Sequence, residues 1–172
     1  MIPVPTLTAA GLVLRQLTAA DAEALHAAHS DATTHQYWSS PAHTSVGQTA
    51  AFIDETLALP GARAWAITED GGEALGRVAL FEIRDGVGEF GIILRREAQG
   101  RGYAAKAVEL VAKYGFETLG LHRLVADIDP DNSASLTLFL RNGFQREGLL
   151  KQNWKTHLGL RDSVVMAKLR DA

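Results

Sequence analysis

The residues of this chain that are best placed to do chemistry form a glycine-containing turn. It spans residues 95–104, RREAQGRGYA, between a strand-like apolar segment at residues 90–94 and a long helical pattern. Glycines at such a turn let several backbone N–H groups point at one spot, and the helix N-terminus adds a partial positive charge. From Arg95 to Lys106 four cations outnumber one anion, giving +3, whereas the whole chain carries −3. We therefore expect the turn to bind the phosphate of a small ligand rather than a nucleic acid.

The elements that must position this turn follow from apolar periodicity and from turn residues. Helices are expected from residue 18 or 21 to 29, from 45 to 59, from 102 past 115 and from 132 to 141. Strands are expected at residues 12–15, 64–67, 74–83, 87–94, 124–128, 144–154 and 164–169. Antiparallel strands come first, then a strand–helix–strand–helix unit, then more strands. This order predicts a mixed α/β fold.

Composition limits the class of protein. A chain of 172 residues, 47% hydrophobic and 22% charged, suits one globular domain, which we expect to span residues 1–172. No apolar run approaches the ~20 residues of a membrane-spanning helix, and residues 1–5 lack the features of a signal peptide. The absence of cysteine excludes disulfides, thiolate nucleophiles and cysteine metal sites. We expect a cytoplasmic protein with no membrane partner.

Several motifs, in order along the chain, resemble those of the GNAT acetyltransferase superfamily. Residues 99–104 match its Q/R-x-x-G-x-G/A signature, and residues 100–104 resemble the G-K-G-Y-A turn of its RimJ/RimL-type branch. The other matching blocks are residues 12–15 with 21–22, residues 121–123, residues 129–135 and residues 142–144. The resemblance covers nearly the whole chain and is best over residues 89–148.

The resemblance implies acetyl-CoA as co-substrate, an amine as acceptor, direct attack in a ternary complex, and no metal. It implies the GNAT fold, a mostly antiparallel sheet flanked by about four helices and splayed open between the strands ending near Leu94 and Asp129. Pantetheine would lie in that split against the backbone of Ile92, Ile93 and Leu94. The pyrophosphate would lie on the turn formed by Gln99, Gly100, Arg101, Gly102, Tyr103 and Ala104.

The resemblance also suggests which residue removes the proton from the amine, whose pKa of ~10 keeps it charged at neutral pH. Asp127 is the first candidate, because it lies on the strand flanking the split where relatives often carry glutamate. Its shorter side chain favours a relaying water. Glu89, on the opposite flanking strand, is the second candidate, and ordered water alone is the third. Asp127 would otherwise bond to the following turn, and Glu89 would be an ordinary strand residue.

A thiolate leaves more easily than an amine loses its proton, so an acid matters less. Many superfamily members place a tyrosine where this chain has Phe139. The RimL-like pattern offers Ser135 instead, three residues after Asn132, and the spacing puts all three on one helical face. We expect Ser135 to protonate the thiolate, Asn132 to bind ligand or cap the helix, and Phe139 to line the pantetheine tunnel or belong to the core.

The acceptor side is expected to include His35, Tyr37 and Trp38, a polar–aromatic cluster after the first helix. The branch favours a protein N-terminal α-amine, with free amino acids, polyamines and antibiotics as alternatives and a homodimer expected by analogy. The chain has six histidines, of which His26 and His29 share a helical face. We predict no metal site, because no third ligand follows at a meaningful spacing.

Two other functions compete with this interpretation. Gly100-x-Gly102-x-x-Ala105 fits the Rossmann fingerprint, and Asp127 lies 25 residues after Gly102, so an NAD(P)-binding protein is one alternative. Against it, a hairpin rather than a parallel series precedes the motif. The other alternative is a GNAT-fold module that binds acetyl-CoA without catalysis, because Phe139 replaces the usual tyrosine and Asp127 the usual glutamate.

Overall fold

The backbone is organised around one large sheet with helices on both faces. The structure is a computed structural model that describes residues 2–170, except for the side chains of Glu82 and Ile83; the expected domain limits, residues 1 and 172, lie outside this range. The strands within it are β1 (Leu7–Ala9), β2 (Leu12–Gln16), β3 (Arg63–Thr68), β4 (Gly76–Arg84), β5 (Val87–Leu94), β6 (Arg123–Ile128), β7 (Gln145–Thr156) and β8 (Gly159–Leu169). They lie in the order β1-β2-β3-β4-β5-β6-β8-β7, and of the described neighbours only β5 and β6 run parallel. The predicted mixed, mostly antiparallel sheet is confirmed.

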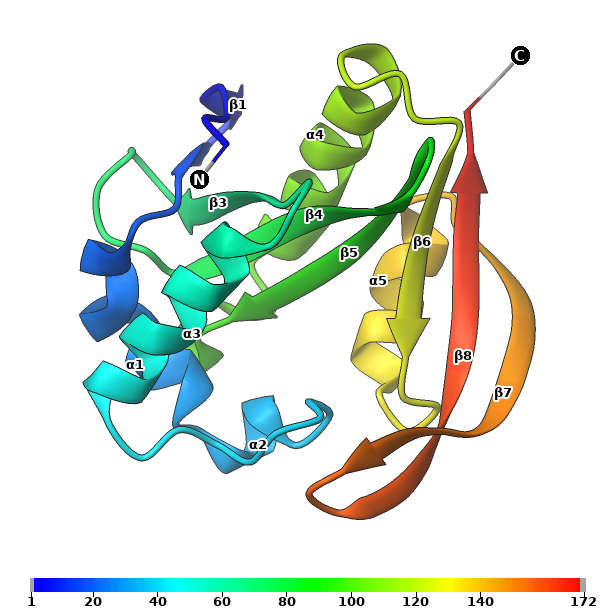
Figure 1. The fold of residues 1–172 in the computed structure, drawn as a ribbon. Helices are drawn as coiled ribbons and strands as arrows, with labels where there is room; N and C mark the ends of the chain where they lie inside the picture. Colours follow the sequence, from blue (N-terminus) through cyan, green and yellow to red (C-terminus); the bar gives the residue numbers. More distant parts are fainter. Residues whose placement is uncertain (1, 171–172) are drawn as a thin grey trace.

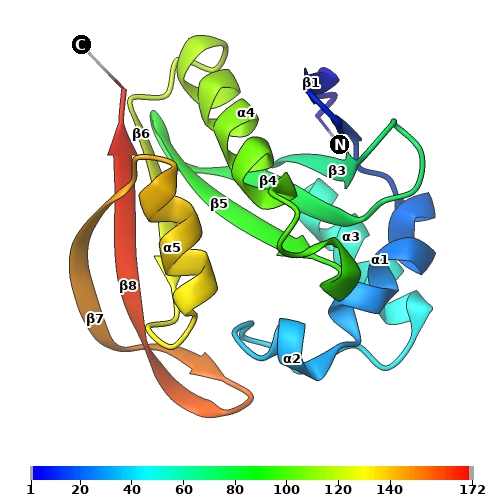
Figure 2. The same cartoon turned by 180° about the vertical axis from the view of Figure 1, so that it is seen from behind.

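The helices form a layer on each face of the sheet (Figures 1 and 2). They are η1 (Ala19–Asp21), α1 (Ala22–His29), α2 (Ala32–His35), α3 (Val46–Ala58), η2 (Arg96–Ala98), α4 (Tyr103–Glu117) and α5 (Ser133–Arg141). Helices α1 and α3 cover one face, and α4 and α5 cover the other. The apolar stripe expected after the turn is buried: Val108, Val111, Ala112 and Gly115 all face the sheet. This packing fixes the position of the α4 N-terminus, where the turn lies.

Two short elements were not predicted. Strand β1 has three residues and pairs with β2 through a tight turn containing Gly11, whose φ is +67°. Helix α2 has four residues and begins because the Asp31 side chain accepts a hydrogen bond from the Thr33 N–H at 2.9 Å. Neither is long enough to show a period in the sequence.

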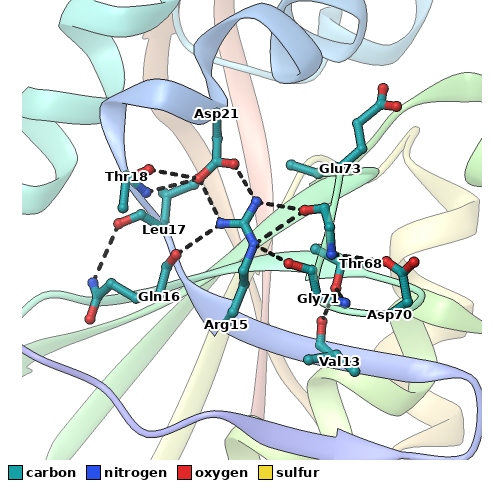
Figure 3. Close-up of polar contacts among 12 residues, drawn as sticks. Val13, Arg15, Gln16, Leu17, Thr18, Asp21, Thr68, Asp70, Gly71 and Glu73 are labelled. Carbon is teal, nitrogen blue, oxygen red and sulfur yellow. Dashed lines mark hydrogen bonds and ion pairs between the residues drawn. The ribbon is translucent and has the colours of Figure 1, made fainter.

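A partly buried ion pair near the end of β2 connects the first strands to the helical layer (Figure 3). The Arg15 guanidinium donates to both carboxylate oxygens of Asp21, at 3.0 and 2.6 Å. It also donates to the carbonyls of Gly71 and Gly72, at 2.9 and 2.8 Å. Arg15 therefore anchors the β3–β4 turn, which carries Glu69 toward the start of α4.

Candidate active site

The sheet opens where β5 and β6 diverge. Their parallel pairing runs from Val87 opposite Arg123 to Glu89 opposite Val125, whereas the two strands continue to Leu94 and Ile128. A cavity of about 280 Å³ lies at this divergence, and its walls include residues of β5, β6, α5, the α2 region and the β7–β8 ribbon. The split lies between the two strands that the resemblance implies. Beyond Glu89 and Val125 the two strands no longer pair with each other, and the cavity lies beside them.

Four carboxylate residues line this cavity, and two of them, Glu89 from β5 and Asp127 from β6, lie on the strands that diverge. Glu89 is half-buried, and burial, followed by the nearby charge of Asp127, raises the pKa of its carboxyl group above the usual value. Removing a carboxylate from water and placing it near a like charge both disfavour its ionised form. The arrangement brings together a carboxyl group with raised proton affinity and a second carboxylate beside it.

Helix α5 presents the predicted face to the cavity. Asn132 is its N-cap, and its side-chain oxygen accepts the Ser135 backbone N–H at 3.1 Å. Asn132, Ser135 and Phe139 all line the cavity. Phe139 also belongs to the core, where its ring lies 5.7 Å from that of Phe90 and 5.0 Å from that of Phe144. The sequence left a helix cap or a ligand contact open for Asn132, and the core or the tunnel wall open for Phe139. In the structure each residue has the structural position and also lines the cavity.

The turn before α4 has the geometry that a phosphate cradle requires. Gly100 and Gly102 have φ of +76° and +81°, and Gly102 is the N-cap of α4. Such backbone angles favour glycine. A Cβ added at either glycine would meet nothing within 4 Å, so the space above the turn is open. With the first N–H groups of α4 directed outward, these residues fit the pyrophosphate of a coenzyme A thioester.

The cations around this turn pair with acids from other parts of the chain. Arg101 binds Glu69 at 2.6 Å, and the Tyr103 hydroxyl also contacts Glu69. The remaining contacts are Arg95 with Glu73 and Glu97, Arg96 with Asp31 at 2.9 Å, and Lys106 with the Ala10 carbonyl at 2.6 Å. The local charge of +3 expected from the sequence window is therefore offset, because Glu69, Glu73 and Asp31 lie outside that window.

The other predicted cofactor contacts come before the two glycines of the turn. The Ile92 side chain lines the cavity, whereas those of Ile93 and Leu94 are buried. Gln99 donates from its side chain to the Leu94 carbonyl at 3.2 Å and to the Thr34 hydroxyl at 3.5 Å. Gln99 thus ties the end of β5 to the α2 region and holds the turn between them.

The predicted acceptor residues separate into two groups. Tyr37 and Trp38 line the cavity, and the Tyr37 hydroxyl donates to the Asp131 carbonyl at 3.3 Å, across the cavity mouth. His35 is 1% exposed and is not among the lining residues, because the α2 turn directs it inward. Its ring lies 5.5 Å from that of Trp38 at an interplanar angle of 15°. His35 therefore supports the wall that Trp38 forms.

Behind that wall lies a cluster of three buried histidines, His29, His35 and His43, whose potential ligand atoms lie within 4.8 Å of one another. The sequence had paired His29 with His26 and found no third imidazole. The buried Arg77 donates from Nε to Nε2 of His29 at 3.5 Å. Burial and the charge of Arg77 lower the pKa of His29 to about 2, and burial lowers that of His35 to about 4. A guanidinium at this ring opposes a second cation there, so the cluster is best described as neutral packing.

Sequence reasoning missed polar residues of the β7–β8 ribbon that line the cavity or contact its carboxylates. Arg161 lines the cavity and binds both carboxylate oxygens of Asp129, at 2.8 and 2.9 Å. This pairing lowers the pKa of Asp129. Asn153 on β7 donates to Oδ2 of Asp127 at 3.2 Å. No local sequence pattern predicts these contacts, because each joins residues more than 25 positions apart in sequence.

The sequence profile of the acetyltransferase (GNAT) domain matches residues 11–145. This chain belongs to the GNAT acetyltransferase family. The GNAT protein is 34% identical over 155 residues to the uncharacterized N-acetyltransferase YoaA of Bacillus subtilis, covering 86% of this chain and 87% of YoaA. It is 28% identical over 155 residues to the spermidine N(1)-acetyltransferase of Escherichia coli K12, covering 89% and 83% of the two chains.

The fold of this GNAT protein is shared with solved acetyltransferases. The spermidine N-acetyltransferase of Vibrio cholerae, in complex with CoA and spermine, superposes with a TM-score of 0.81 at 24% identity, covering 94% of this chain and 96% of the other. The chain is an acetyl-CoA-dependent N-acetyltransferase, with acetyl-CoA as co-substrate. The dinucleotide-binding alternative is wrong. A Rossmann fold needs a series of parallel strands, whereas β5 and β6 form the one parallel pair among the described strands. None of the helices over residues 2–170 combines the length and apolar content that a membrane crossing requires.

Proposed function

We propose that this enzyme acetylates a primary amine of a small cationic acceptor, with polyamines as the leading class. The observation that carries the proposal is the pair of carboxylates, Glu89 and Asp127, on the two strands that diverge at the cavity. Aromatic walls at Tyr37, Trp38 and Trp154 suit the methylene segments between charged amines. The similarity to spermidine N(1)-acetyltransferase supports the same acceptor class.

Glu89 and Asp127 would have different roles in the reaction. Glu89 is the better proton acceptor, because its pKa is raised toward neutrality and a base works best with a pKa near the working pH. Asp127 would attract the ammonium group into the cavity. The sequence placed Asp127 first as base, and the burial of Glu89 favours the reverse order. Ser135 would donate a proton to the departing sulfur.

The donor would lie in the split. Residues 99–104 would hold the pyrophosphate of acetyl-CoA, while Ile92, Asn132 and Phe139 would contact the pantetheine. Acetyl-CoA supplies the acetyl group as a thioester when it is bound. Closing the cavity with Trp38 and the Tyr37–Asp131 contact would limit water at the reacting centre.

A protein N-terminal α-amine is the second candidate acceptor. The motifs at residues 100–104 and 129–135 that resemble the RimJ/RimL-type branch favour it. A protein terminus would bring one ammonium group, whereas a polyamine brings several. The two candidates therefore differ in how strongly they depend on negative charge at Asp127.

The test is a turnover assay with acetyl-CoA against spermidine, putrescine, single amino acids and peptides with free N-termini. We expect the highest kcat/KM with a polyamine, and Glu89→Gln should lower kcat by about 10²- to 10⁴-fold. A higher kcat/KM with peptides would instead favour a protein N-terminal α-amine as the acceptor. Turnover of none of these amines would show that the acceptor belongs to another class of amine.

A further inference from the structure

Strand β7 contains an irregularity beside the cavity. Its register with β8 shifts between Leu150, opposite Ser163, and Trp154, opposite Arg161. Residues 151–153 of β7 therefore lie opposite Asp162 alone. Gln152, within this bulge, has φ of +51°, a left-handed conformation that is uncommon for a residue other than glycine. Strained backbone and β-bulges concentrate where a protein must direct a side chain to a particular place.

The bulge is held by polar contacts to Asp162. The Gln152 N–H donates to Oδ1 of Asp162 at 2.9 Å, and the Lys151 ammonium contacts Oδ2 at 2.7 Å. The first contact pairs the Gln152 backbone N–H, and the second ties the Lys151 side chain to the opposite strand. The conformation of Gln152 is thus stabilised locally.

The bulge directs the Asn153 side chain across β8 toward β6. Its Nδ2 donates to Oγ of the buried Ser163 at 2.9 Å and to Oδ2 of Asp127 at 3.2 Å. Strand β8 lies between β7 and β6, and adjacent strands are about 4.8 Å apart, so a side chain on a regular β7 would be roughly 10 Å from β6. The bulge brings Asn153 within hydrogen-bonding distance of Asp127.

We propose that Asn153 is a positioning residue that holds the Asp127 carboxylate at the cavity, and that the β7 bulge exists to place it there. The inference rests on the proposed function, in which Asp127 receives the cationic acceptor beside Glu89. Asn153 itself is not among the cavity-lining residues, so it acts through Asp127. An amide is suited to this task, because its two N–H groups bind Ser163 and Asp127 at once and bring no charge.

This arrangement has an electrostatic consequence at Glu89. The charge of Asp127 contributes to the raised pKa of Glu89, after burial. If Asp127 is released from Asn153, its carboxylate is no longer fixed, and the pKa of Glu89 changes with the distance between the two charges. The acid limb of the activity profile moves with this pKa, whereas neutralising Asp127 removes the charge and moves the limb to lower pH.

The test compares Asn153→Ala, Asp127→Asn and the double variant, with Lys155→Ala, an exposed position on the same strand outside the bulge and the cavity, as the control. We expect Asn153→Ala to raise the KM for the amine by about 5- to 20-fold, leave the KM for acetyl-CoA within twofold, and shift the acid limb of the activity profile. In the Asp127→Asn background, Asn153→Ala should add less than twofold. Lys155→Ala should keep the wild-type profile. Calorimetry of amine binding in the presence of CoA should show the same loss without turnover.

The outcomes separate the inference from the proposed function. If Glu89→Gln and Asp127→Asn both keep wild-type kinetics, the proposed site is wrong. If those two variants are impaired but Asn153→Ala retains the wild-type amine KM and pH profile, the positioning role is wrong. Full additivity of Asn153→Ala and Asp127→Asn, with a lowered Tm, would show that Asn153 only stabilises the ribbon. Asn153→Ser, which keeps one donor, should recover part of the amine affinity.

Discussion

At the scale of single residues, the cavity contains the carboxylates of Glu89 and Asp127, which lie in different environments, and one candidate proton donor, Ser135. Glu89 is half-buried and Asp127 is held from β7, so neighbours in space rather than in sequence determine what each can do. Ser135 lies one helical turn from the N-cap Asn132, at the end of α5 that faces the cavity. Its backbone N–H is already used by Asn132, and its hydroxyl is the group that could serve the sulfur.

Substitution of Ser135 tests this role. Ser135→Ala should lower kcat by about 10- to 100-fold, because general acid catalysis of this kind contributes up to ~10²- to 10⁴-fold and a thiolate needs only part of it. Acetyl-CoA affinity should change less than twofold, since the N-cap bond uses the Ser135 backbone. Ser133→Ala, on the exposed first residue of the same helix, is the control. Unchanged kcat in Ser135→Ala, measured at saturating substrates, would remove Ser135 as the acid.

At the scale of elements, the turn between β5 and α4 is defined by two glycines with positive φ. Space above Gly102 is open, and the first N–H groups of α4 border it. A glutamate there would fill the cradle and place a negative charge where the phosphate must lie. The structural cost comes only from the left-handed backbone, about 1–2 kcal/mol for a non-glycine residue.

Gly102→Glu should therefore abolish acetyl-CoA binding while the fold persists. Gly120→Glu is a matched control, because Gly120 has φ of +70° and equally open surroundings, but follows the C-terminus of α4. Both variants should lose about 2–8 °C in Tm from the same strain. In calorimetric titration with acetyl-CoA, only Gly102→Glu should lose the signal. Normal binding by Gly102→Glu would show that the pyrophosphate lies elsewhere.

The elements also show how far sequence reasoning extends. The helices expected from residue 45 and from residue 102, and the strand expected at residues 87–94, follow from local patterns, so they were predicted within a few residues. The contacts that sequence reasoning missed join segments that are far apart in the chain. Glu69 reaches Arg101 across 32 positions, and Asn153 reaches Asp127 across 26. Such contacts depend on sheet order and on one bulge, neither of which has a local signature.

At the scale of the whole molecule, the segment that carries Tyr37 and Trp38 joins the two halves of the site. It is tied to the cofactor turn by Asp31 with Arg96, and to the sheet by the histidine cluster packed around Arg77. The Arg77 guanidinium lies 5.0 Å from the ring centroid of Trp38 and 4.8 Å from that of Phe52. The wall of the cavity therefore depends on histidines that stay neutral.

This dependence predicts a loss of stability in mild acid. Folding lowers the pKa of His29 to about 2 and that of His35 to about 4, below the 6.5 of a free imidazole, and it also lowers that of His43. Below pH 6.5 the unfolded chain binds protons that the native chain does not, so the free energy of unfolding falls as pH falls, by up to ~1.4 kcal/mol per pH unit for each such histidine. Arg77, His26 and His157 are the other positive or titratable groups that act on the cluster, and none supplies a compensating negative charge.

Urea unfolding from pH 7.5 to pH 5 measures this slope. His35→Phe keeps a ring against Trp38 and removes one titrating group, so its slope should be shallower than that of the wild type by up to ~1.4 kcal/mol per pH unit, whatever its stability at pH 7.5. Because the native cluster stays neutral over this pH range, His35→Phe should leave the pH dependence of the amine KM unchanged. Equal slopes in the two proteins would mean that His35 is protonated in the native state, and that the cavity wall does not rest on a neutral cluster.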